Sequence, residues 1–317
     1  MSDLEKNSGG IPIRPLGRTG VSVSILGLGG GHIGRAAIPQ QEAVRLIQSG
    51  IDQGISFMDN AWEYHDGESE VRMGMALEGR RDKVVLMTKV CARDAKTAAA
   101  QLDESLTRLR TDVIDVWQFH EVNYDNDPQW LFGPDGAIDA AVKAKQAGKI
   151  RFIGFTGHKS PHIFRRMLDV DFDWDTVQMP VSVMDRHYRS FLDEVMPELT
   201  RRQIGCIGMK SLGGGGQTVL GAGLTAQECR RYSMSQEISV LVTGMESEQD
   251  LNQDLEIARN FTPMTAEEQK ELLERVRPVA GDGRFEVYKS TQFYDSGYHR
   301  DQHGFPPIGH VGDSPKE

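Results

Sequence analysis

Short apolar runs alternate with longer stretches of helical periodicity along most of the chain. The runs are rich in Val, Ile and Leu and are bounded by turn-forming residues, which is typical of β-strands. They predict strands at residues 23–28, 55–58, 84–89, 113–120, 150–156, 176–181, 205–210 and 238–243. The stretches between them repeat apolar residues with the period of a helix. They predict helices at residues 41–53, 69–77, 95–109, 137–147, 163–168, 191–202, 225–235 and 248–260.

This alternation predicts an α/β fold with parallel strands, because each helix can cross over between neighbouring strands. Eight such units fit a (β/α)8 TIM barrel, for which 317 residues is an adequate length. An open, doubly wound sheet is the alternative arrangement. We expect residues 11–317 to form a single domain and residues 1–10 to be disordered. Residues 278–317 are expected to form a C-terminal tail near the mouth of the barrel.

Two segments lie outside the repeat. Residues 11–24 contain the turn signal GRTG and predict an N-terminal β-hairpin that closes one end of the barrel. Thr265 and Glu268 form a capping-box pattern, which predicts a last helix as far as about Val276. From residue 281 onward the chain is rich in Gly, Asp, His, Tyr and Pro, and we expect an irregular loop there.

Composition narrows the range of partners. The formal net charge is −10, from 36 Lys and Arg against 46 Asp and Glu, so neither nucleic acid nor an anionic membrane surface is expected to bind. The apolar runs stay shorter than the roughly 18 residues of a membrane span, and the first residues, MSDLEKNSGG, do not resemble a signal peptide.

Cys91, Cys206 and Cys229 are widely spaced, which favours neither disulfides nor a zinc motif, and the cytoplasm is the expected compartment. The oligomeric state stays open.

Four ionisable residues fall at or just after the ends of three neighbouring predicted strands. Asp59 and Tyr64 follow the second strand, Lys89 ends the third and His120 ends the fourth. In a parallel barrel these ends meet at the mouth, where catalytic groups stand. Each residue alone is typical of a cap, a packing residue or a solvated charge. Together they predict acid–base chemistry, because an ammonium beside a phenol lowers its pKa, a carboxylate holds the ammonium, and an imidazole can orient a carbonyl oxygen.

The sequence resembles the aldo-keto reductases in the order and spacing of separate motifs: RPLGRTGVSVSILGLGG, GISFMDNAWEYHDGESE, MTK, DVWQFH, KIRFIGFTGH and QMP. The resemblance covers roughly residues 11–260. It implies a TIM barrel, a nicotinamide cofactor at the mouth, and reversible hydride transfer to an aldehyde, ketone or sugar carbonyl. It makes Tyr64 the proton donor, Lys89 the residue that tunes it, Asp59 the partner of Lys89, and His120 the residue that orients the carbonyl.

The resemblance also places a cofactor site in the loops of the mouth. Residues 29–34 match the pattern GxGxxG, but the helical pattern begins only after Pro39, which is not typical of a Rossmann site. By resemblance, Gln178 would hydrogen-bond the carboxamide, Met209 would pack on the nicotinamide, and Lys210 would approach the pyrophosphate; a mobile loop at residues 213–216 is the alternative. The expected cofactor residues are Gly30, Thr156, Gln178, Met209, Lys210, Leu212, Gly214, Gly244, Glu246, Ser247, Asp250, Gln253 and Asp254.

Three acids depart from the pattern of relatives that bind NADPH. Glu246, Asp250 and Asp254 stand where a base or an amide is expected by resemblance. A carboxylate repels a 2′-phosphate but accepts a hydrogen bond from a 2′-hydroxyl, so NAD(P)H is the expected cofactor class, with NADH preferred. Two alternatives remain open: the acids can simply favour the N-terminal end of a helix, and an arginine from elsewhere can restore NADPH binding.

Trp62 and His32 are expected to bound a pocket for a small carbonyl or alcohol substrate, together with residues 121–128, Trp130, Phe132 and tail residues 293–303. No metal is expected, because histidines 299, 303 and 310 do not follow a ligand spacing, and Cys91 is expected to be inert. A cofactor-binding regulatory or sensor subunit is the alternative function. A metal-dependent barrel hydrolase would need more acids or histidines at one mouth than the pair Asp59 and His120.

Overall fold

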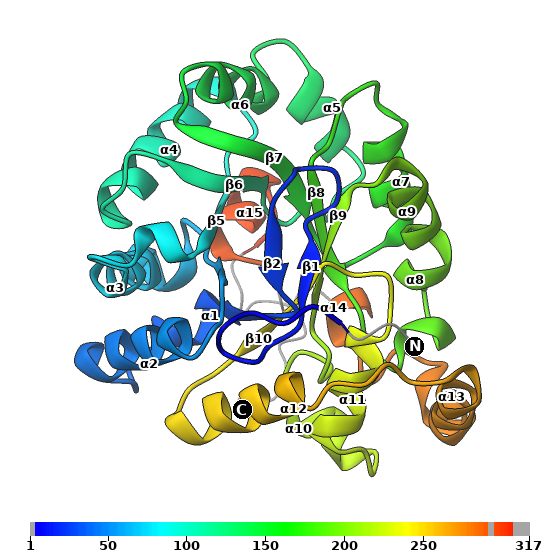
Figure 1. Cartoon of the computed structure of the whole chain (residues 1–317). Coiled ribbons are helices and arrows are strands. Elements are labelled where there is room, and N and C mark those ends of the chain that lie inside the picture. Colours follow the sequence, from blue (N-terminus) through cyan, green and yellow to red (C-terminus); the bar gives the residue numbers. More distant parts are fainter. Residues whose placement is uncertain (1–3, 291–294, 307–317) are drawn as a thin grey trace.

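The computed structural model describes residues 4–290 and 295–306. Eight parallel strands close into a barrel in the order β10-β3-β4-β5-β6-β7-β8-β9, which confirms the predicted TIM barrel. The helices surround it (Figure 1). The barrel strands are β3 (Leu26–Gly29), β4 (Phe57–Asp59), β5 (Val85–Val90), β6 (Ile114–Phe119), β7 (Ile150–Thr156), β8 (Thr176–Pro180), β9 (Gly205–Met209) and β10 (Val240–Gly244).

The helices follow the strands as crossover connections and as additions to the mouth. The α-helices are α1 (Gly30–Ile33), α2 (Gln40–Asp52), α3 (Glu68–Leu77), α4 (Ala95–Arg108), α5 (Asp127–Phe132), α6 (Ala137–Gln146), α7 (Pro161–Asp169), α8 (Phe191–Glu194), α9 (Met196–Arg202), α10 (Gln217–Gly221), α11 (Ala226–Met234), α12 (Glu248–Arg259), α13 (Ala266–Ala280), α14 (Val287–Ser290) and α15 (Gly297–Gln302). Three 3-10 turns are η1 (Tyr64–Gly67), η2 (Arg81–Lys83) and η3 (Asp185–His187).

Apolar side chains fill both sides of the barrel wall, because successive residues of a strand point to opposite faces. One buried cluster includes Phe57, Met87, Val116 and Ile207, contributed by four of the strands. A second and larger cluster includes residues of the surrounding helices, such as Leu46 of α2. The two layers hold the strand ends at fixed positions, so side chains at those ends have a rigid base.

The N-terminal hairpin closes the end of the barrel opposite the mouth. Strand β1 (Ile13–Pro15) pairs antiparallel with β2 (Ser22–Ser24), as predicted. The Arg14 side chain donates to the carbonyl oxygen of Ile238 at 2.8 Å, just before β10 begins. The single strand predicted at residues 23–28 is wrong, because it divides between β2 and β3. The Ser24 hydroxyl donates to the carbonyl oxygen of Leu26 at 2.6 Å across this break.

Two further predictions differ from the structure. The helix predicted at residues 191–202 is divided into α8 and α9, because Pro197 lies in the first turn of α9 and has no N–H to continue α8. The tail predicted as an irregular loop contains α14 and α15, and Ser296 caps α15 by accepting from the amide of His299 at 3.3 Å. The capping box of Thr265 opens α13, which continues to Ala280.

The N-terminal residues were expected to be disordered. Residues 1–3 lie outside the described part of the chain, but residues 4–10 contact the barrel. Lys6 forms an isolated antiparallel bridge with Pro12, and the Asn7 side chain donates to the carbonyl oxygen of Gly54 at 2.7 Å.

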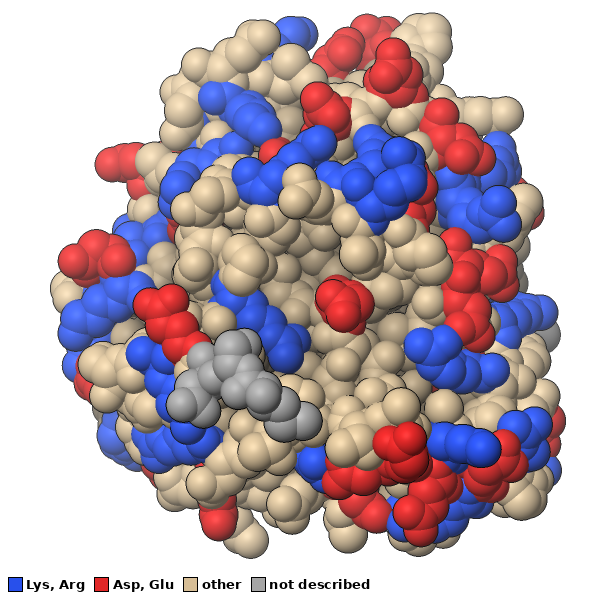
Figure 2. Space-filling model, turned by 45° about the vertical axis from the view of Figure 1, so that its right-hand side comes forward, with Lys and Arg blue, Asp and Glu red and all other residues tan. Residues whose placement is uncertain are grey.

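The outer surface carries charges of both signs. Lys and Arg are interspersed with Asp and Glu over the face shown in Figure 2. None of the helices in the described ranges combines the length and the apolar composition that crossing a membrane requires.

Candidate active site

The carboxyl ends of β4, β5 and β6 bring the four predicted catalytic residues together. Asp59 ends β4, Lys89 lies one residue before the end of β5, and His120 follows β6 directly. Parallel pairing of β4 with β5 and of β5 with β6 places these ends side by side. Tyr64 opens η1 in the loop after β4, and its ring lies 5.6 Å from that of His120 in an edge-to-face arrangement.

Lys89 is the centre of this group. Its ammonium forms an ion pair with Asp59, donates to the carbonyl oxygen of Asn60 at 2.8 Å and lies 3.3 Å from the Tyr64 hydroxyl. Asp59 also accepts from Nε2 of Gln178 at 3.0 Å. Lys89 is only 1 % exposed. Removing one charge of such a pair leaves the other buried and uncompensated, which costs about 3–5 kcal/mol. The pair therefore fixes the ammonium against the phenol.

The electrostatics keep Tyr64 protonated and His120 neutral. Burial, followed by the carboxylates of Asp59, Glu63 and Glu121, raises the pKa of Tyr64 well above its usual range. This direction is opposite to the lowering expected from Lys89, because the sequence did not show how many acids surround the phenol. Burial likewise lowers the pKa of His120 and outweighs the opposing effect of Glu63. At neutral pH the site therefore holds a neutral phenol and a neutral imidazole.

Glu63 is a site residue that the sequence did not reveal. Its carboxylate lies against Nδ1 of His120 and accepts from the Cys91 thiol at 2.6 Å. Burial raises the pKa of Glu63, but His120 and the thiol outweigh it and bring it to about 2. Burial and Glu63 raise the pKa of Cys91 well above its usual range, so without a bound cation the thiol stays protonated. In sequence, Glu63 is only a loop residue beside Tyr64, and nothing indicates its direction.

Tail helix α15 supplies further walls of the pocket. Tyr298 packs edge-to-face on Trp62, a predicted substrate residue, with ring centroids 5.4 Å apart. His299 is fully buried, and its ring centroid lies 6.1 Å from that of His120. The His303 ring stacks on Trp130 at 4.5 Å. Phe293, which the sequence also placed in this region, and His310, considered there only as a metal ligand, lie outside the described residues.

His32, the other predicted substrate residue, lies at the β10 side of the mouth. It follows β3 in α1 and contacts Gly244, where a Cβ would meet the imidazole at 1.8 Å. Its Nε2 is 3.8 Å from the carboxylate of Glu246. Of the two predicted substrate residues, Trp62 therefore packs against α15, and His32 is beside predicted cofactor residues.

The predicted nicotinamide contacts lie at adjacent strand ends. Thr156 ends β7 and pairs in register with Gln178 of β8, and Met209 ends β9. Oε1 of Gln178 is buried and accepts no hydrogen bond within the described chain. Buried acceptors are nearly always satisfied, so this atom is fitted to receive the amide N–H of a carboxamide. Gly30 directly follows β3 and lies against the end of β4. A Cβ at this position would meet the carbonyl oxygen of Asp59 at 2.7 Å.

The β9 loop, expected at the pyrophosphate, is covered by the tail. Burial lowers the pKa of Lys210 to about 8, and its ammonium lies 5.2 Å from the Tyr288 ring centroid. Leu212 is half-buried, and Gly214 adopts a left-handed φ of 89° that favours glycine. The loop thus offers backbone amides and one half-buried amine close to the mouth.

The three acids at the start of α12 have three different environments. Glu246 is exposed and pairs with Arg35 at 2.6 Å. Asp250 accepts from the Ser247 hydroxyl at 2.8 Å and from the amide of Glu246 at 3.1 Å, so it stabilises the start of the helix. Asp254 is 1 % exposed and forms an ion pair with Arg230 of α11, and burial raises its pKa to about 6. The enclosed carboxylate argues against the predicted contact of Asp254 with the cofactor.

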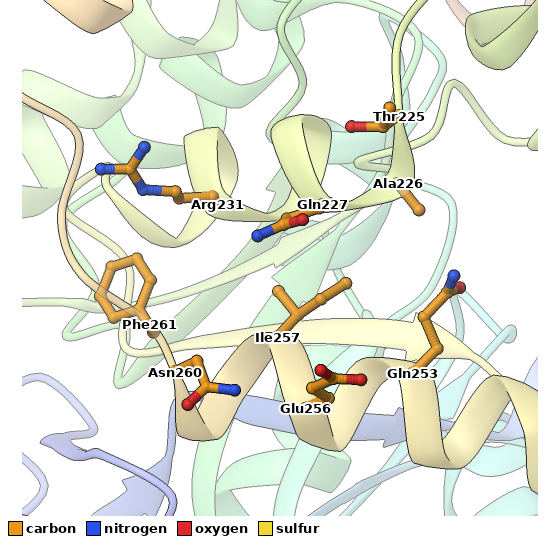
Figure 3. Close-up of a pocket in the computed structure, with 9 residues that line it drawn as sticks. All are labelled: Thr225, Ala226, Gln227, Arg231, Gln253, Glu256, Ile257, Asn260 and Phe261. Carbon is orange, nitrogen blue, oxygen red and sulfur yellow. The ribbon is translucent and has the colours of Figure 1, made fainter.

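Gln253 borders a groove between α11 and α12 (Figure 3). The groove encloses about 300 Å³, and its walls include Thr225, Gln227 and Ile257. In Figure 3, Gln253 and Ile257 of α12 extend toward α11 across this space. Among the three predicted residues of α12, Gln253 is thus the one whose side chain faces a cavity.

Comparisons with known proteins agree with this geometry. A sequence model described as the Aldo/keto reductase family matches residues 25–256. L-galactose dehydrogenase from Arabidopsis thaliana is 33 % identical over 159 residues, which is 46 % of this chain and 49 % of the relative. Methylglyoxal reductase YeaE from Escherichia coli is 35 % identical over 135 residues, 41 % of this chain and 44 % of the relative. The chain therefore spans about half the length of the curated relatives it matches.

A solved structure shows the same fold. The aldo-keto reductase AKR11C1 from Bacillus halodurans, described as a holo form, superimposes with a TM-score of 0.72 at 22 % identity. The superposition covers 87 % of this chain and 99 % of that chain, so the barrel and its additions share one architecture.

Proposed function

The chain belongs to the aldo/keto reductase family, and from this membership we propose that it transfers hydride between a nicotinamide cofactor and a small aldehyde, ketone or sugar carbonyl. The observation that carries the proposal is the Tyr64 hydroxyl, held 3.3 Å from the ammonium of Lys89 beside His120. The family as a whole acts on carbonyl compounds. The roles of individual residues and the substrate class are proposals for this chain.

In the proposed reduction, the carbonyl carbon gains a hydride and the carbonyl oxygen gains the Tyr64 proton, so that C=O becomes CH–OH. The bound cofactor supplies the hydride. Lys89 stabilises the phenolate that remains, and Asp59 keeps the ammonium in position. Glu63 fixes the orientation of the His120 ring through Nδ1, and His120 would position the carbonyl oxygen. Solvent then returns a proton to Tyr64.

The proposed cofactor is NAD(P)H. Gln178 and Thr156 would hold the carboxamide, Met209 would pack on the ring, and Lys210 with the β9 loop would bind the pyrophosphate. Oε1 of Gln178 supports this assignment, because it is buried and accepts no hydrogen bond from a described residue, so a donor on the cofactor can complete it. The proposed preference for NADH rests on Glu246 alone, since Asp250 accepts from Ser247, the N-cap of α12, and Asp254 is enclosed.

The substrate proposal draws on the relatives and on the pocket. Two relatives carry the names of a sugar dehydrogenase and of a reductase of a small dicarbonyl compound. Trp62 and Tyr298 place aromatic rings next to the reacting groups. Aromatic walls suit an apolar chain or the apolar face of a sugar. We therefore expect turnover first among short aldehydes and sugar carbonyls.

Tyr64→Phe tests the function. We expect kcat for carbonyl reduction to fall by about 10²–10⁴, because the general acid is lost, while the dissociation constant of the cofactor changes little. Tyr188→Phe is a matched control, since Tyr188 follows η3 in the connection after β8 and is none of the four residues. If the unmodified protein binds cofactor but reduces no carbonyl compound in a broad screen, the enzymatic proposal fails and a cofactor-binding sensor is favoured.

A further inference from the structure

A second group of side chains, which we call the Cys91 cluster, comprises the half-buried Glu63 and the buried Cys91, His120, Glu121 and His299. One ligand atom from each of Cys91, His120 and His299 lies within 4.8 Å of the others. The same holds for Glu63, His120 and Glu121. The residues come from the ends of β5 and β6, from the loop after β4 and from α15, so no local spacing in the sequence announces them.

His299 enters the cluster without a hydrogen-bond partner. Its side chain is fully buried, and neither ring nitrogen has a hydrogen bond to any described residue. Nε2 lies 3.7 Å from a carboxylate oxygen of Glu121, beyond hydrogen-bond distance. A buried polar group without a partner loses about 1–3 kcal/mol of solvation. Such a group is retained where something other than a protein atom completes it.

The cluster also contains more acid than its neighbouring cations compensate. Within the described ranges, neither Glu63 nor Glu121 has a Lys or Arg within ion-pair distance. Lys89 pairs instead with Asp59, and Arg93 pairs with Asp127 at 2.8 Å. Burial and the neighbouring Glu63 raise the pKa of Glu121 well above its usual range, as expected of a buried carboxyl group without a paired cation.

We propose that the Cys91 cluster binds a divalent transition metal ion, Zn²⁺ above all, through Cys91, His120, His299 and Glu63. Sulfur, imidazole nitrogen and carboxylate oxygen are together the ligand set of zinc sites, whereas Mg²⁺ and Ca²⁺ take oxygen alone. Binding forms a zinc–thiolate bond and releases the Cys91 proton to solvent. Glu63 meets Nδ1 of His120, so the ion lies on that side of the ring and Nε2 stays free for the proposed carbonyl contact. The site goes beyond the proposed function, which needs no metal.

Metal titration of the chelator-treated full chain tests the site. We expect one equivalent of Zn²⁺ to bind more tightly than about 1 µM in competition with a chromophoric chelator. Co²⁺ in its place should give a thiolate-to-cobalt charge-transfer band, which Cys91→Ser removes. His299→Ala should weaken binding at least about tenfold. Cys229→Ser, a buried free cysteine of α11, should change neither affinity nor spectrum.

Two results would overturn the site: no stoichiometric binding of Zn²⁺ to the unmodified protein, or an unchanged affinity and cobalt spectrum in Cys91→Ser. The outcome is independent of the proposed reductase activity, because binding is measured without turnover. Tyr64→Phe should bind the metal like the unmodified protein. If the metal-free protein reduces carbonyl compounds but binds no Zn²⁺, the proposed metal site is refuted and the proposed reductase function still stands.

Discussion

The strand ends of β4 to β6 and the rim around α12 make an instructive contrast. Asp59, Lys89 and His120 project from buried strand ends, and the structure places them beside Tyr64, as their sequence positions suggested. On α12, Asp250 and Asp254 share one helix but have unrelated partners: a helix cap and a buried arginine. The position of a side chain at a strand end is fixed by the geometry of the closed barrel. The partner of a side chain on a surrounding helix depends instead on which neighbouring element packs against that part of the helix.

The largest expected effect is at Lys89. Lys89→Met should lower kcat by about 10²–10⁴, because the phenolate of Tyr64 loses its cation. It should also destabilise the fold by about 3–5 kcal/mol, since Asp59 is left buried without a partner. Steady-state kinetics and urea denaturation measure the two effects.

Lys289→Met separates chemistry from stability. Lys289 of tail helix α14 is also fully buried, and it pairs with Asp185 of η3 at 2.6 Å. We expect it to cost similar stability while kcat per folded molecule changes by less than tenfold. Equal losses of kcat in both variants would mean that Lys89 acts through the fold and not on Tyr64.

Asp254 should make the free energy of unfolding depend on pH. Its pKa in the folded protein is raised to about 6, above the ordinary value of an aspartate. The folded state therefore binds the proton more tightly than the unfolded state, and stability from this group falls as pH rises from about 4 to 6. Relative to Asp254→Asn, the unmodified protein should lose up to about 3 kcal/mol over that interval. Denaturation midpoints at pH 4, 5, 6 and 7 measure it; parallel curves for both proteins would contradict an enclosed, titrating Asp254.

The smallest effect is expected at Arg35, which pairs with Glu246 on the exposed rim. Arg35→Ala should leave the carboxylate of Glu246 bare and shift the ratio of NADPH to NADH dissociation constants toward NADH by up to about fivefold, the scale of an exposed ion pair. Glu246→Gln should shift it the other way. Fluorescence titration with both cofactors checks the ratio. Tenfold tighter binding of NADPH than NADH by the unmodified protein would end the proposed NADH preference.

Much of the fold followed from periodicity. Alternation predicted the barrel and the capping box predicted the start of α13, because both depend on local pattern. The break at Pro197 and the short helices of the tail did not follow, since packing against the mouth decides them. The strand-end residues of the site were foreseen for the same reason as the strands themselves.

The rest of the site could not be read from the chain. Glu63 and His299 are separated by more than two hundred residues, yet both reach His120. The direction of the Tyr64 pKa was also missed, because it depends on burial and on carboxylates from the end of β4 and from the loops after β4 and β6. The approach of His299 to His120 requires the tail to dock on the mouth, and no spacing rule encodes that docking.

The position of α15 has a consequence for how the molecule is made. Translation proceeds from the N-terminus, so every strand of the barrel leaves the ribosome before Tyr298 and His299 do. The barrel can therefore close around its apolar interior before Tyr298 and His299 are present at its mouth. Ser296 then docks through its amide, which donates to the carboxylate of Glu121 at 2.9 Å. Maturation of the pocket is thus a late event, separate in time from assembly of the scaffold that carries it.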